Sequence, residues 1–185
     1  MNKLPKQLVY LRVVISVVLI LASFLNYESP KVLMGLICVA FLSDVFDGIV
    51  ARKYNCSTEK LRQMDSRADS FFWLSVCIVL IRFYPEFISH NKLKLFILIC
   101  SEIAIQVFAY LKYGKSLALH TYSAKLWAVL LFFSVLCVIA KYKTQLIFDF
   151  AFYWGLISQI EVLVILLSQK KFLVDVKSLF SLKRD

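Results

Sequence analysis

Four aspartates in two pairs are the residues of this chain whose types and spacing best suit chemistry. Asp44 and Asp47 are three residues apart, and Asp65 and Asp69 are four residues apart. Residues at these spacings lie on the same face of a helix, about one turn from each other. A hairpin of two helices, joined by the segment between the pairs, could therefore bring all the carboxylates together.

Carboxylates gathered at a membrane edge repel each other and resist removal from water. Protonation or a bound cation relieves this repulsion. Oxygen-only ligands favour hard ions such as Mg²⁺ or Mn²⁺, and a pair of such ions can stabilise the attacking and leaving oxygens of phosphoryl transfer. The alternative is that these are ordinary acids at helix ends. It explains one or two of them but not the paired spacing, so the pattern predicts a metal site.

Small and basic residues accompany the aspartates. Gly48 and Ala51 follow Asp47 with a spacing that lets a backbone or a ligand approach closely. Arg52 and Arg67 add positive charge at the same level, which suits a phosphate-bearing ligand.

On these residues the chain resembles the CDP-alcohol phosphotransferase family, and within it the phosphatidylglycerophosphate synthases. The family signature is D-x2-D-G-x2-A-R-x8-G-x3-D-x3-D. Seven of its eight fixed positions are matched over 26 residues, by Asp44, Asp47, Gly48, Ala51, Arg52, Asp65 and Asp69. The opening Leu4-Pro5, Leu8 and Arg12 also look like the start of these synthases. The second glycine of the signature is replaced by Leu61, whose large side chain is expected to stand near the nucleotide.

The resemblance implies a phospholipid-synthesising enzyme that transfers a phosphatidyl group from CDP-diacylglycerol to an alcohol and releases CMP. Its cofactor would be Mg²⁺ or Mn²⁺, as a pair of ions held by Asp44, Asp47, Asp65 and Asp69. Asp69 would also be the general base that deprotonates the alcohol. The residues expected against the CMP part of the donor are Asp44, Gly48, Ala51 and Arg52.

Glycerol 3-phosphate is the acceptor that the resemblance favours. Leu61, and Ser101 in place of an arginine that these synthases often carry, leave other substrates open. These are inositol phosphate, phosphatidylglycerol as acceptor, or another CDP-alcohol as donor. A cation-coupled membrane transporter is the alternative from a different class, but transport predicts acids near the bilayer midplane on several helices.

The acceptor-binding candidates are Arg67, His120 and Lys125. Lys125 lies near the start of the apolar segment Ser123–Ala140, where related synthases carry a lysine-containing stretch near the acceptor phosphate; the alternative is an interfacial anchor. His120, next to that segment, is more simply explained as an interfacial residue.

Three further polar residues lie inside apolar segments, namely Glu102, Gln106 and Glu161. They are candidates for function, but interhelical hydrogen bonds, or pairing with Arg12 or Arg67, explain them more simply.

Composition places the chain in a membrane. It is 61% hydrophobic, well above the roughly 45–50% of soluble domains, with a mean hydropathy of +0.75. Each of its six apolar segments is long enough to cross a bilayer as a helix. They are Leu8–Leu25, Val32–Ala51, Asp65–Tyr84, Leu95–Leu111, Ser123–Ala140 and Gln145–Ser168. The expected fold is an all-α bundle of six transmembrane helices in a single domain over residues 1–185, with the signature at 44–69.

Charge sets the expected orientation. With both termini cytosolic, sixteen lysines and arginines fall inside and six outside, as the positive-inside rule requires. This accounts for the net charge of +10 without nucleic acid as a partner. We expect an active site that faces the cytosol, a bacterial inner membrane as the location and a homodimer as the assembly.

Overall fold

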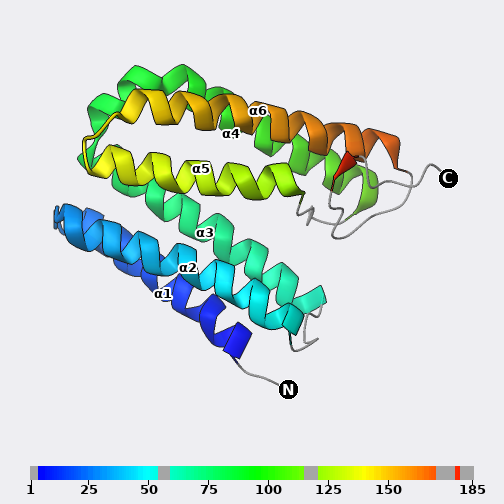
Figure 1. The fold of residues 1–185 in the computed structure, drawn as a ribbon, viewed down its shortest axis with the longest axis horizontal. Helices are drawn as coiled ribbons and strands as arrows, with labels where there is room; N and C mark the ends of the chain where they lie inside the picture. The colour runs from blue at the N-terminus through cyan, green and yellow to red at the C-terminus, as the bar shows by residue number, and fades with distance from the viewer. Residues whose placement is uncertain (1–3, 54–58, 115–120, 170–177, 180–185) are drawn as a thin grey trace. The chain divides into compact units, whose positions relative to one another are not determined.

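The computed structural model describes residues 4–53, 59–114, 121–169 and 178–179 (Figure 1). Six α-helices account for nearly all of these residues. They are α1 (Leu4–Phe24), α2 (Pro30–Lys53), α3 (Glu59–Phe83), α4 (Pro85–Tyr113), α5 (Tyr122–Ile139) and α6 (Thr144–Ser168). Each of the six expected segments falls essentially within one of these helices, and the described residues contain no strand. The all-α fold class is therefore confirmed.

The stretch between the expected segments Asp65–Tyr84 and Leu95–Leu111 is not a separate connection, because Pro85–Lys94 form the first turns of α4. Proline is well tolerated at the start of a helix, where its missing N–H has no partner to lose. The polar residues of these turns bond to α6. Asn91 and Gln145 exchange two side-chain hydrogen bonds of 3.1 and 3.0 Å, and Lys94 Nζ lies 2.5 Å from Asp149 Oδ1.

The stretch Arg52–Met64, between the expected segments Val32–Ala51 and Asp65–Tyr84, is partly helical as well. The helix α2 continues to Lys53 and α3 already begins at Glu59. The charged residues here suggested a loop, but charges are acceptable in a helix that ends outside the apolar part of a membrane.

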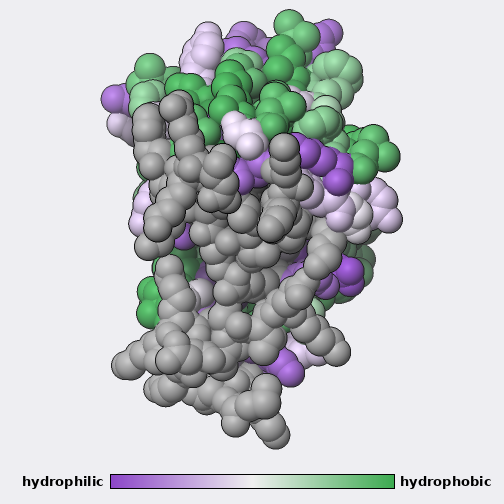
Figure 2. Space-filling model, turned by 90° about the vertical axis from the view of Figure 1, so that its right-hand side faces the viewer, coloured by the Kyte–Doolittle hydropathy of each residue, from purple (hydrophilic) through white to green (hydrophobic). Residues whose placement is uncertain are grey.

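Five of the six described helices are long and apolar enough to cross a membrane: α1, α2, α4, α5 and α6. The exception, α3, carries its acids and bases in its first half, except for Arg82 in its last turn, and its second half is mostly apolar. Large apolar side chains lie exposed along the helices, among them Leu21, Phe96 and Leu146, and Figure 2 shows such apolar surface in green. The protein is an integral membrane protein; the count of six spans stays a prediction.

The helices belong to two compact units, Met1–Ser89 and His90–Asp185. The first unit contains α1, α2 and α3, and the second contains most of α4 together with α5 and α6. The single domain over residues 1–185 stays a prediction from the sequence.

In the first unit, α1 packs against both α2 and α3, whereas α2 and α3 have few contacts with each other. The buried stripe of α1 repeats every three or four residues, as expected for a helix in the middle of a bundle. Its members are Val9, Arg12, Ser16, Leu19 and Ser23. One position of this central stripe is therefore an arginine.

In the second unit, α5 and α6 pack closely. A Cβ atom placed on Gly155 would come within 2.5 Å of Trp127 Nε1, so only glycine allows this approach.

The intramembrane acids of this unit accept hydrogen bonds, both from their own helix and from a neighbouring helix. Glu102 accepts from Gln106 (3.1 Å) and from Gln159 of α6 (3.4 Å), and Glu161 accepts from Ser123 of α5. The hydrogen-bonded role expected for these acids is confirmed. The contacts of Arg12 are instead with acids of its own unit.

Candidate metal centre

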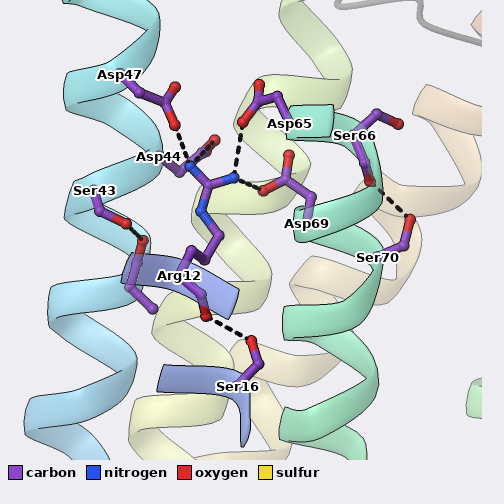
Figure 3. Close-up of polar contacts among 10 residues, drawn as sticks. Arg12, Ser16, Ser43, Asp44, Asp47, Asp65, Ser66, Asp69 and Ser70 are labelled. Carbon is purple, nitrogen blue, oxygen red and sulfur yellow. Dashed lines mark hydrogen bonds and ion pairs between the residues drawn. The ribbon is translucent and has the colours of Figure 1, made fainter. Parts of the chain in front are cut away.

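The two pairs of aspartates meet at one end of the three-helix unit. Asp44 and Asp47 lie in the second half of α2, and Asp65 and Asp69 lie in the first half of α3. Figure 3 shows the four carboxyl groups turned toward a common point. One carboxylate oxygen from each of Asp44, Asp47 and Asp65 lies within 4.8 Å of the other two.

The common point is occupied by the guanidinium of Arg12, which reaches it from α1 (Figure 3). Nη2 lies 2.5 Å from Asp47 Oδ2 and 3.1 Å from Asp44 Oδ1. Nη1 lies 2.9 Å from Asp65 Oδ1 and also donates to Asp69 Oδ1. Each terminal nitrogen thus serves the two acids of one helix, which is an arrangement that the planar fork of arginine allows and a lysine ammonium does not.

The sequence interpretation expected the α2–α3 hairpin to bring the pairs together directly. The pairs do converge, but through α1, which lies between them. Arg12 carries the residue-level signal that could have revealed this, since it is a charged residue within an apolar segment. From the sequence alone, Arg12 is expected as a cytosolic base or as a partner for Glu102 or Glu161, and its place between the aspartates is not predicted.

Formal charge leaves this cluster negative. Among the described contacts, the four carboxylates face a single guanidinium, so their formal negative charge, when all are ionised, exceeds its positive charge. Hard divalent cations prefer a set of carboxylate oxygens at one site. The donor set and its excess charge both fit a divalent metal ion.

The carboxylates differ in their access to solvent. The Asp47 side chain is 6% exposed, whereas those of Asp44, Asp65 and Asp69 are 37%, 24% and 33% exposed. A hydrated ion can therefore approach from the side of the last three. Asp47 lies at the closed side of the cluster.

Gly48 is next to Asp47 on α2. A Cβ atom placed on it would meet no described atom within 4 Å, so there is room beside it for a ligand. The side chains of Ala51 and Arg52, expected at the nucleotide, lie outside the described part of the chain.

Leu61, which replaces the second glycine of the signature, is 8% exposed and packs with Val9 and Ala68. Val13 and Met64 pack against the same group. Its side chain therefore belongs to the contact between α1 and α3.

The acceptor-binding candidates are not brought together by any described contact. Arg67 is exposed on α3, in the first unit. Lys125 is exposed on α5, in the second unit, with Nζ 5.8 Å from the centre of the Tyr122 ring. His120 lies outside the described residues.

The fold and the site together define a class of protein. It is a helical membrane protein with a carboxylate cluster that is able to hold a metal ion. The chain belongs to the CDP-alcohol phosphatidyltransferase family, whose sequence profile matches residues 2–168. The expected resemblance is thereby confirmed over most of the chain.

Similar proteins that are named as enzymes come from Rickettsia. The CDP-diacylglycerol–glycerol-3-phosphate 3-phosphatidyltransferase of Rickettsia felis is 36% identical over 82 residues, which are 44% of this chain and 45% of the relative. The protein of the same name from Rickettsia typhi is 35% identical over 83 residues, 44% of this chain and 47% of the relative. The aligned part therefore spans less than half the length of these relatives. No solved structure matches the chain significantly.

Proposed function

We propose that this protein transfers a phosphatidyl group from CDP-diacylglycerol to an alcohol and releases CMP, as a step of phospholipid biosynthesis. The observation that carries the proposal is the convergence of the four signature aspartates at one end of the first unit. Membership of the family supports it. The names of the Rickettsia relatives favour glycerol 3-phosphate as the acceptor.

The residues that would hold the metal are Asp44, Asp47, Asp65 and Asp69, and Mg²⁺ or Mn²⁺, as a pair of ions, suits their oxygens. When bound, the metal would supply positive charge to the pyrophosphate of the donor and to the attacking oxygen. Gly48 gives room beside Asp47 for the CMP part, where Asp44, Ala51 and Arg52 also belong by the family signature.

Asp69 is the proposed general base. It is part-exposed and one helical turn beyond Asp65, so its carboxylate can meet an acceptor that enters from water. It would take the proton of the acceptor hydroxyl while that oxygen bonds to the phosphorus that bears the diacylglycerol. The bond from this phosphorus to the bridging oxygen of the pyrophosphate breaks, and CMP leaves with the electron pair.

Several wider features belong to the same proposal. Six spans with cytosolic termini would place the aspartate cluster at the cytosolic face of a bacterial inner membrane. Arg67, His120 and Lys125 are proposed to help bind the phosphate of the acceptor. The protein is proposed to act as a homodimer, which light scattering of the detergent-solubilised protein would test.

The test of the function is CMP release by the purified protein. CDP-diacylglycerol would be supplied with Mg²⁺ or Mn²⁺ and, separately, with glycerol 3-phosphate, inositol phosphate or phosphatidylglycerol. We expect turnover with glycerol 3-phosphate, its loss with EDTA and its return with metal. Turnover with a different alcohol would correct the acceptor alone. Absence of both turnover and CDP-lipid binding would contradict the transferase function. The cation-coupled transporter would then remain as the alternative.

A further inference from the structure

Arg12 is a buried charged residue that the proposed mechanism does not use. Its side chain is 0% exposed, and its guanidinium contacts all four candidate metal ligands. It comes from α1, outside the family signature at residues 44–69. Its third nitrogen, Nε, is buried with no hydrogen-bond partner among the described residues, so the two terminal nitrogens make the contacts of the guanidinium with the acids.

A buried arginine is costly to desolvate, and its ion pairs often do no more than offset that cost. Such a residue is poorly explained as a stabilising element alone. In this site it has a specific electrostatic effect, because without it four carboxylates would face each other with no cation between them.

We propose that Arg12 is the resident counter-ion of the metal centre: it holds the four carboxylates together when no metal is bound, and it competes with divalent metal for them. This inference rests on the proposed metal site. Each of its contacts uses one oxygen of a carboxylate, and a carboxylate has two. The guanidinium and a metal therefore share ligands, and their like charges oppose each other.

Two consequences follow for Arg12→Gln, which removes the charge but keeps a polar side chain. In EDTA, four uncompensated carboxylates destabilise the protein, and its unfolding midpoint falls below that of the wild type. In Mn²⁺ the metal replaces the missing cation, and the unfolding midpoint returns most of the way to that of the wild type. The Kd for Mn²⁺ falls by about tenfold, because an opposing charge in direct contact with the ligands has gone.

The experiment measures Mn²⁺ binding by isothermal titration calorimetry and thermal unfolding in detergent, without donor or acceptor. The matched control is Arg82→Gln, since Arg82 is an exposed arginine of the same unit that donates to the side-chain oxygen of Asn26, a neutral residue outside the acidic cluster. The control is expected to keep the wild-type Kd and the wild-type response to EDTA.

Unchanged or weaker Mn²⁺ binding by Arg12→Gln, with normal binding by the wild type, overturns the inference and leaves the proposed function intact. Absence of Mn²⁺ binding by the wild type overturns the metal site and this inference together. If Arg12→Gln does not fold even in Mn²⁺, Arg12→Lys replaces it. A single ammonium cannot serve both pairs of acids, so its Kd is expected to fall several-fold, and a wild-type or weaker Kd counts against the proposal.

Discussion

Arg12 of α1 and Asp47 of α2 form a buried ion pair, with Nη2 2.5 Å from Oδ2 and side-chain exposures of 0% and 6%. The pair is not one-to-one, because the same guanidinium also contacts the three other aspartates. Among the described contacts of the site, one positive charge therefore faces four acids. Such an excess lowers the stability of the metal-free protein and raises its affinity for a divalent cation.

The excess of negative charge predicts opposite effects for two Asp→Asn changes. Asp44→Asn removes an acid that is in excess, so it should stabilise the protein in EDTA by about 1 kcal/mol while it weakens Mn²⁺ binding. Asp149→Asn removes the acid of a one-to-one pair with Lys94, so it should destabilise by up to about 1 kcal/mol with no effect on Mn²⁺. Thermal unfolding and calorimetry check both changes. A loss of stability for Asp44→Asn in EDTA would contradict the charge argument.

Asp69→Asn tests the proposed base. The amide cannot accept the acceptor proton, so CMP release should fall by about 10²-fold or more. The fold should be retained, because the change lowers the negative excess of the cluster. Asp149→Asn is the matched control, with turnover near the wild-type rate. Near-normal turnover by Asp69→Asn would remove it from the role of base.

The helices and the grouping of the acids could be predicted from the sequence, for a physical reason. Apolar runs of membrane-spanning length must form helices because their backbone has no other partner in lipid. Residues three or four apart must share a helix face. The positions of Asp44, Asp47, Asp65 and Asp69 therefore follow from local rules, once α2 and α3 lie near each other.

The role of Arg12 could not be predicted in this way. Its place between the acids depends on α1 packing against both α2 and α3, which is a tertiary contact with no signal in local spacing. The same contact explains Leu61, which resemblance alone assigned to the nucleotide but which packs on Val9. Pro85–Lys94 was missed for a similar reason, because Gln145 and Asp149 of α6 provide partners for its polar residues.

Gly155→Ala is expected to disturb the contact between α5 and α6. The added methyl would lie 2.5 Å from Trp127 Nε1 and 2.7 Å from Cε2, and such overpacking costs about 1–3 kcal/mol. Gly35→Ala is the control, since a Cβ at Gly35 meets no described atom within 4 Å. Trp127→Phe, which shortens the ring, should reduce the cost of Gly155→Ala in the double variant. Thermal unfolding measures all four proteins, and equal midpoints for Gly155→Ala and Gly35→Ala would contradict the close approach.

Leu61→Ala separates a packing role for this residue from a crowded nucleotide site. Leu61 is buried with Val9 and Ala68, so its truncation should destabilise the protein by about 2 kcal/mol, at the low end for buried leucines. The control is Leu74→Ala on the same helix, where the side chain is 56% exposed and truncation should matter little. Affinity for the CDP-lipid, measured by calorimetry, should not rise in Leu61→Ala if the side chain only joins α1 to α3. A rise in affinity together with an unchanged unfolding midpoint would instead mean that Leu61 crowds the donor.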